Sequence, residues 1–240
     1  MRVLIDLIIL LIIALCAWRG WKKGLIVGLC GLLALGVSVY AADVISKAYY
    51  ADYTQILDPV ISGYTDTSTG TVTAEIDPED EEAKHPYVEL TKEEKEDVYS
   101  VTYAVMRQCG VAADPSEKIA AEFDEQYDKV DYALIGGMGE YLTARITYVL
   151  LFAAVFVLIY ALFCILENIL NLTFSLPGVA DYVNRGLGAV AGVLRAIALL
   201  LVICCVCRYL GILLGNDRIV GTVFFEKLIN SNFIANRLGI

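Results

Sequence analysis

The sequence predicts an all-α integral membrane protein with about four transmembrane helices and an acidic, helical and partly disordered insert between the second and third spans. Of the 240 residues, 58% are hydrophobic, and the mean hydropathy is +0.64. A typical globular domain is only about 45–50% apolar. The apolar residues gather in four runs, while most acidic residues gather in one long segment. These two kinds of segment require different surroundings.

Four apolar runs approach the roughly 20 helical residues needed to cross a bilayer core of about 30 Å. Among them they hold two charged residues, Asp6 in the first and Arg195 in the fourth. Helices of soluble proteins rarely stay apolar on every face for this length. We therefore predict spans at residues 3–18, 25–42, 146–166 and 186–207.

The first two runs are predicted to form a transmembrane hairpin over residues 1–42. A signal peptide is the alternative for the first run, but Asp6 interrupts its start and no cleavage site of the A-x-A kind follows. The positive-inside rule places the short turn between the runs on the cytoplasmic side. The turn holds three cations and two glycines: Arg19, Gly20, Lys22, Lys23 and Gly24.

The insert, residues 43–145, carries 23 of the 28 acidic residues and 8 basic ones, a net charge of −15, while the rest of the chain carries +5. Its acidity argues against nucleic-acid binding. The orientation of the hairpin places the insert on the extracytoplasmic side of the membrane. Within it, residues 64–84 are rich in Thr, Ser, Gly, Asp and Glu, which is typical of a mobile loop. A single cysteine, Cys109, lies in the insert, so no internal disulfide is expected and this thiol is predicted to serve as a topology probe.

Two helices are predicted in the second half of the insert. The first begins at the capping box formed by Thr91 and Glu94 and ends at Gly110. The second begins at Asp114, with Pro115 at its first helical position. Each has one apolar face, made of Val98, Val101, Val105 and Cys109 in the first helix and of Ile119, Phe123, Tyr127 and Val130 in the second.

After the second transmembrane pair, residues 146–207, the tail 208–240 is amphipathic. It is predicted either to lie in the membrane interface or to pack back on the bundle. Its cations oppose the orientation chosen above, because the same topology places them outside: Arg208, Arg218, Lys227 and Arg237.

Two stretches, in their order along the chain, resemble the colicin V production protein (CvpA) family. The first is Ile5-Asp6, an apolar run, and the turn Arg19-Gly20-Trp21-Lys22-Lys23-Gly24-Leu25. The second is Leu176-Pro177-Gly178, Asn184-Arg185-Gly186-Leu187-Gly188 and Gly192-Val193-Leu194-Arg195. The resemblance covers less than half of the chain, and the long insert departs from the compact family pattern. It implies a bacterial inner- or plasma-membrane protein linked by name to toxin production, with no known catalytic residues.

The charges inside the runs are predicted to form one polar cluster in the bundle. A charge near the centre of a span costs about 2.5–3.5 kcal/mol on insertion scales, so it usually faces protein or water. Asp6 is the only acidic residue within the four runs and is the candidate to neutralise Arg195, with the hairpin cations as neighbours. The alternative is that Asp6, close to the end of its run, reaches the interface.

Glycine spacing predicts close contacts between helices. Gly20, Gly24 and Gly28 recur every four residues, as do Gly188 and Gly192. This spacing lets two helix backbones approach closely. A gap lined by lipid or substrate is the alternative interpretation.

No motif for catalysis or for a cofactor is present, and we expect neither a metal nor a cofactor. Cys204, Cys205 and Cys207 serve as small apolar residues, because the only histidine, His85, lies in the insert. The acidic run 79–82 is better explained as a solvated charge run than as a Ca²⁺ site.

We therefore expect a non-enzymatic membrane protein that supports toxin production, export or envelope maintenance through a protein partner in the membrane or envelope. The alternative is a small channel or transporter built as a homo-oligomer, with an embedded enzyme as a third hypothesis. Asp6 and Arg195, the glycine-lined helices, and the arginines and glycines in both halves favour the channel or transporter, because transporters often consist of inverted repeats.

Overall fold

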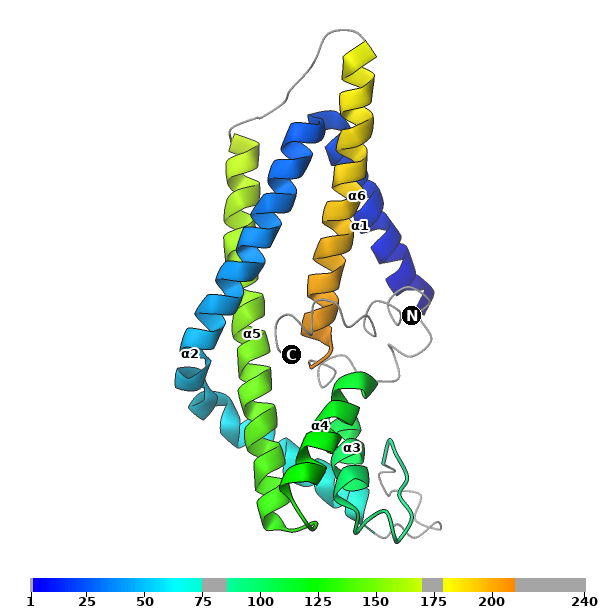
Figure 1. Ribbon diagram of the computed structural model, residues 1–240, viewed down its shortest axis with the longest axis vertical. Coiled ribbons are helices and arrows are strands. Elements are labelled where there is room, and N and C mark those ends of the chain that lie inside the picture. The colour runs from blue at the N-terminus through cyan, green and yellow to red at the C-terminus, as the bar shows by residue number, and fades with distance from the viewer. Residues whose placement is uncertain (1, 75–85, 170–178, 210–240) are drawn as a thin grey trace. The chain divides into compact units, whose positions relative to one another are not determined.

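The structure is a computed structural model that describes residues 2–74, 86–169 and 179–209, with side chains from residues 7 and 181 onward in the first and last ranges. The described residues form helices and no strand, which confirms the predicted all-α class (Figure 1). The helices are α1 (Arg2–Lys23), α2 (Leu25–Thr73), α3 (Val98–Gln108), α4 (Ala113–Gln126), α5 (Tyr132–Ile169) and α6 (Val179–Cys207).

Three helices among the described residues are long and apolar enough to cross a membrane, namely α2, α5 and α6. In the most apolar 18-residue stretch of α5, only 17% of the residues are buried inside the protein. Apolar side chains that pack on nothing in their own chain suit contact with lipid, and three such helices indicate a membrane protein. The 22-residue helix α1 corresponds to the first predicted run.

The chain divides into two compact units, and α2 and α5 contribute to both. The apolar unit comprises the described residues of Met1–Ala48 and Leu150–Val206. The α3–α4 unit comprises those of Tyr49–Val149 and of Cys207–Asp217. The predicted boundaries at 42/43 and 145/146 are therefore not helix ends, since α2 continues to Thr73 and α5 begins at Tyr132.

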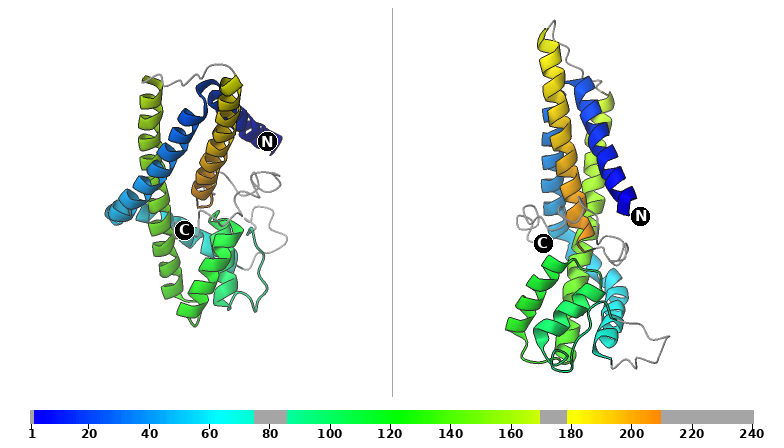
Figure 2. Two further views of the ribbon diagram at one scale, coloured as in Figure 1. Left: turned by 45° about the horizontal axis from the view of Figure 1, so that its top comes forward. Right: turned by 90° about the vertical axis from the view of Figure 1, so that its right-hand side faces the viewer.

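The apolar unit packs α2, α5 and α6 around a small aromatic core. Phe152 and Phe156 of α5 are buried against Ala42 of α2 and Val202 of α6. The ring of Phe156 stacks on Tyr160 with a centroid separation of 5.5 Å. Figure 2 shows α1 beside α6 at the end where α1 joins α2.

The prediction of a loop at residues 64–84 is wrong for residues 64–73, which form the last turns of α2. Thr65 and Thr69 lie on a buried face and donate their hydroxyls to carbonyls four residues earlier, Thr65 to Ile61 at 2.9 Å and Thr69 to Thr65 at 2.9 Å. Burial of this face, with Val72 at 1% exposure, outweighs the weak helix propensity of threonine. Residues 75–84 lie outside the described residues.

The two predicted helices of the insert are present, but both starts were wrong. Thr91 and Glu94 do exchange capping-box hydrogen bonds, yet these close an isolated turn. Helix α3 begins at Val98, because Asp97 caps it by accepting a hydrogen bond from the Ser100 amide at 2.9 Å. Helix α4 begins at Ala113, so Pro115 lies within its first turn and not at its first position. Proline fits there because the amides of the first turn make no intrahelical hydrogen bond.

The predicted apolar faces of these helices are confirmed at most positions. Val98, Val101, Val105 and Cys109 of the first face are buried, as are Ile119 and Phe123 of the second. Tyr127 and Val130 are half-buried. Gly110 follows the first helix with φ of 86°, a left-handed conformation that glycine adopts without strain.

Cys109 is a poor topology probe, contrary to the prediction. Its side chain is 0% exposed, and burial raises the pKa of its thiol, although hydrogen bonds with Ser68 and Thr65 oppose the rise. Both effects slow a maleimide, which reacts with an accessible thiolate.

We expect a maleimide to leave Cys109 unmodified in the folded, detergent-solubilised protein and to modify it after denaturation, as measured by mass spectrometry of the Cys109 peptide. The comparison variant is Lys129→Cys, at a side chain that is 79% exposed, which should react under both conditions. Rapid labelling of Cys109 in the folded protein would contradict the packing of α3.

Candidate functional site

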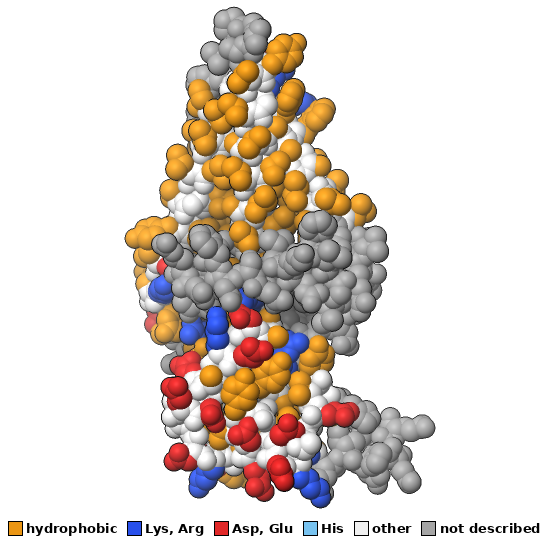
Figure 3. Space-filling view, turned by 45° about the vertical axis from the view of Figure 1, so that its right-hand side comes forward, with side chains coloured by type: hydrophobic (Ala, Val, Ile, Leu, Met, Phe, Trp, Pro, Cys, Tyr) orange, Lys and Arg blue, Asp and Glu red, His pale blue; other side chains and the backbone are white. Residues whose placement is uncertain are grey.

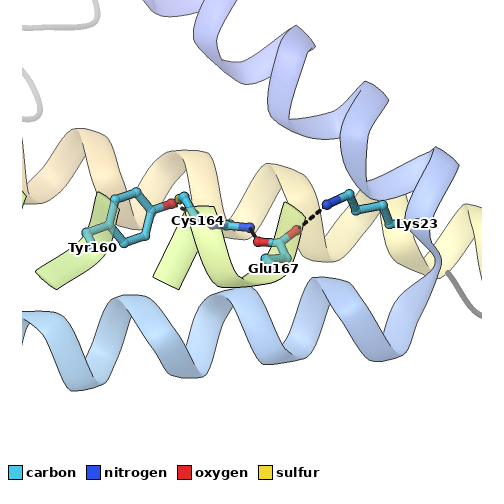
Figure 4. A network of polar contacts seen from close by, with 5 residues as sticks. Lys23, Tyr160, Cys164 and Glu167 are labelled. Carbon is cyan, nitrogen blue, oxygen red and sulfur yellow. Dashed lines mark hydrogen bonds and ion pairs between the residues drawn. The ribbon is translucent and has the colours of Figure 1, made fainter. Parts of the chain in front are cut away.

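The candidate site is a polar cluster inside the apolar unit, centred on the carboxylate of Glu167 (Figure 4). One carboxylate oxygen accepts a hydrogen bond from the Lys23 ammonium at 2.9 Å, and the other accepts one from Nη1 of Arg195 at 3.1 Å. Arg195 also donates from Nε to the Tyr160 hydroxyl at 2.8 Å and from Nη2 to the Cys164 sulfur at 3.4 Å. A single acidic residue therefore bridges two cations.

Three helices bring these side chains together. Tyr160, Cys164 and Glu167 belong to α5, and their spacing of four and three residues places them on one face. Lys23 is the last residue of α1, and Arg195 lies within α6. The ion pairs consequently tie α1 and α6 to the last turn of α5.

The cluster is largely shielded from the surroundings. The side chains of Lys23, Glu167 and Arg195 are 19%, 13% and 15% exposed. Exposed ion pairs contribute about 0–1 kcal/mol, whereas removing one partner of a buried pair costs about 3–5 kcal/mol. The low exposure places this cluster closer to the second case.

A cavity of about 240 Å³ adjoins the cluster. Its lining includes the five side chains of the network together with Arg19 and Cys16, while Val27 and Leu199 supply apolar wall. The cavity is partly open, and Arg19, one of its lining residues, is exposed.

Glycines bring α1 and α6 into backbone contact beside this cavity. A Cβ atom added to Gly20 would overlap the carbonyl oxygen of Gly188, and one added to Gly188 would overlap that of Gly20. A Cβ on Gly192 would overlap the carbonyl oxygen of Cys16. Gly31 of α2 leaves the space that the guanidinium of Arg195 occupies.

The α1–α2 turn is held against α6 by Asn184. Gly24, the only residue between the two helices, has a φ of 83°. The side-chain oxygen of Asn184 accepts a hydrogen bond from the Leu25 amide at 3.0 Å, and Asn184 is 7% exposed. Arg185, by contrast, is half-exposed and pairs with Asp181 one turn earlier at 2.7 Å.

The residues predicted for the site therefore do not all lie in the polar cluster. Arg195 and Lys23 lie in the cluster, whereas Lys22 lies over the Trp18 ring at 5.1 Å from its centroid. The side chain of Asp6 lies outside the described residues, so its pairing with Arg195 stays a prediction.

Glu167 was not among the predicted site residues, because it is the first charged residue after the third apolar run and lies outside the predicted span. The signal was its spacing from Tyr160 and Cys164, which puts a carboxylate on their helical face one residue beyond the predicted span.

No group of three or more metal-ligating side chains occurs in residues 2–74, 86–169 and 179–209. Cys204 and Cys205 are buried on α6. His85 and the acidic run 79–82 lie outside the described residues.

No known protein family, curated protein or solved structure matches this chain. The resemblance to the colicin V production protein family stays a prediction.

Proposed function

We propose that the chain is a four-span protein of a bacterial inner or plasma membrane that supports toxin production, export or envelope maintenance by binding a protein partner, without catalysing a reaction. The observation that carries this proposal is the contrast between the surfaces of its two units. In the apolar unit, Leu33, Leu158 and Val190 are 71%, 63% and 56% exposed. On the face drawn in Figure 3, hydrophobic side chains cover the apolar unit, and acidic side chains gather on the α3–α4 unit.

In this proposal α1 crosses the membrane in addition to α2, α5 and α6, which makes four spans. The Arg19–Gly24 turn lies in the cytoplasm because of its three cations. The α3–α4 unit then lies outside. Arg208, one of the tail cations that oppose this orientation, is 2% exposed and donates to Asp114 within the α3–α4 unit. Its charge is therefore neutralised locally, which weakens the argument against the orientation.

The partner hypothesis is tested with a photo-crosslinking amino acid in native membranes. We expect a probe at Glu125, an exposed residue of α4, to capture one specific protein. A probe at Val157 of α5, 62% exposed on the apolar unit, is the control and should capture lipid. Repeated capture of the chain alone from Glu125 would contradict the partner hypothesis.

A small oligomeric channel or transporter is the second candidate. The charged cavity in the apolar unit favours it, because ionisable residues in spans commonly mark solute or ion paths. Flux through purified protein in liposomes that Arg195→Ala abolishes would support transport. Absence of flux for ions and small solutes would count against it.

A further inference from the structure

We propose that the cavity binds an anionic group of the phosphate type, held by Arg19, Lys23 and Arg195. The proposal concerns binding alone and holds whether or not the anion is transported.

The charges that line the cavity are not balanced. Three cations, Arg19, Lys23 and Arg195, face one carboxylate, Glu167. Arg19 forms no ion pair with another described residue. Among the described residues the lining therefore has a surplus of two positive charges, one of them on the exposed Arg19. At the largely buried Lys23 and Arg195 a surplus charge is costly unless it is compensated. An anion with one or two negative charges supplies that compensation.

The hydrogen-bonding groups are also unbalanced, in the direction of donors. Both oxygens of Glu167 already accept hydrogen bonds, from Lys23 and Arg195. The Lys23 ammonium has three N–H groups and gives one of them to Glu167. Its other two N–H groups meet no strong acceptor among the described residues. Nη2 of Arg195 donates only to the Cys164 sulfur, which accepts weakly.

A phosphate matches this arrangement because its oxygens accept several hydrogen bonds. Arginine fits such a group with two parallel N–H donors, and lysine adds a point charge. The Tyr160 hydroxyl accepts from Arg195 and retains its own hydrogen to donate. A cationic or neutral ligand would leave the surplus charge uncompensated.

Size and access agree with a small anionic group. The volume of about 240 Å³ is below the roughly 300–1,000 Å³ of pockets for drug-sized ligands. The cavity is partly open and its lining residue Arg19 is exposed, so an anionic group from the surroundings can contact it. Such a phosphate comes either from an anionic phospholipid or from the surrounding solution, and both present the same chemistry to the cavity.

The test uses the full-length protein and two probes. The first is inorganic phosphate added to detergent-solubilised protein, with binding followed by the fluorescence of Trp18 and Trp21. These are the only tryptophans of the chain, and both lie in the last two turns of α1. The second is a nanodisc of equal parts phosphatidylglycerol and phosphatidylcholine, from which lipid retained on release into detergent is counted by native mass spectrometry.

Arg19→Gln removes one lining cation without breaking an ion pair among the described residues. We expect it to weaken binding about tenfold or more, as loss of a hydrogen bond to a charged group does. Lys22→Gln is the matched control, because it removes the same charge from the same turn at a residue outside the cavity lining. It should leave binding within about twofold of wild type.

Saturable phosphate binding that only Arg19→Gln weakens supports a site for soluble anions. Selective retention of phosphatidylglycerol without phosphate binding, again lost only in Arg19→Gln, supports a lipid headgroup site. Binding of neither probe overturns the proposal, and so does an equal loss in both variants, because the effect then reflects net charge at the surface.

Discussion

Replacing Glu167 by glutamine is expected to destabilise the apolar unit more than any other single polar substitution in it, lowering the free energy of unfolding by about 3–5 kcal/mol. The change removes the one carboxylate that neutralises Lys23 and Arg195, at distances of 2.9 and 3.1 Å. It leaves two cations close together in a largely buried place. Denaturant or thermal unfolding in detergent, together with the folded yield from membranes, measures the effect.

The matched control for this prediction is Lys47→Gln. Lys47 pairs with Asp43 one helical turn away, and its side chain is 54% exposed, so losing that pair should cost at most about 1 kcal/mol. Equal stability of Glu167→Gln and Lys47→Gln would show that the polar cluster does not hold the helices together.

Double substitutions separate the two acidic candidates for Arg195. Because Arg195 and Glu167 share an ion pair, Glu167→Gln combined with Arg195→Gln should cost less than the sum of the two single changes. Asp6→Asn tests the sequence-based hypothesis in the same way. If Asp6→Asn and Arg195→Gln simply add, Asp6 does not belong to the cluster.

Gly188→Ala is expected to have the second largest effect, a loss of about 1–3 kcal/mol or more from overpacking. The added methyl group would overlap the carbonyl oxygen of Gly20 and lie 2.7 Å from the carbonyl carbon of Gly24. These are backbone atoms, so no side-chain rotation relieves the overlap. Unfolding in detergent measures the loss.

Gly186→Ala on the same helix is the control for Gly188→Ala. A Cβ atom there meets nothing within 4 Å, so the alanine should be neutral or stabilise α6 by up to about 1 kcal/mol through its higher helix propensity. If the two substitutions have the same effect, α1 and α6 are not in backbone contact at Gly188.

Much of the secondary structure follows from local properties of the chain. Long apolar runs without charge indicate helices whose backbone hydrogen bonds close within the segment, and α2, α5 and α6 agree with this. The alternation of buried and exposed positions on α3 follows from its 3.6-residue period. Such features depend only on neighbours in sequence, which is why they were predictable.

Helix ends were less predictable, because several signals compete for them. Thr91 and Glu94 satisfy the capping-box pattern, but Asp97 provides the cap that the helix uses. The threonines at 65 and 69 favour no helix by themselves, and they are helical because their face is buried. The choice in each case depends on packing that no local pattern contains.

By itself the sequence determined the all-helical class, the long apolar helices and the glycine positions where helices approach each other. Only the tertiary structure decided the site, because Lys23 and Glu167 are separated by 144 residues and Glu167 and Arg195 by 28. Nothing in the local pattern around Glu167 shows which cations α1 and α6 bring to it. The pairing arises because a charge shielded from water is stable only beside an opposite charge, and the packing of three helices determines which charges meet.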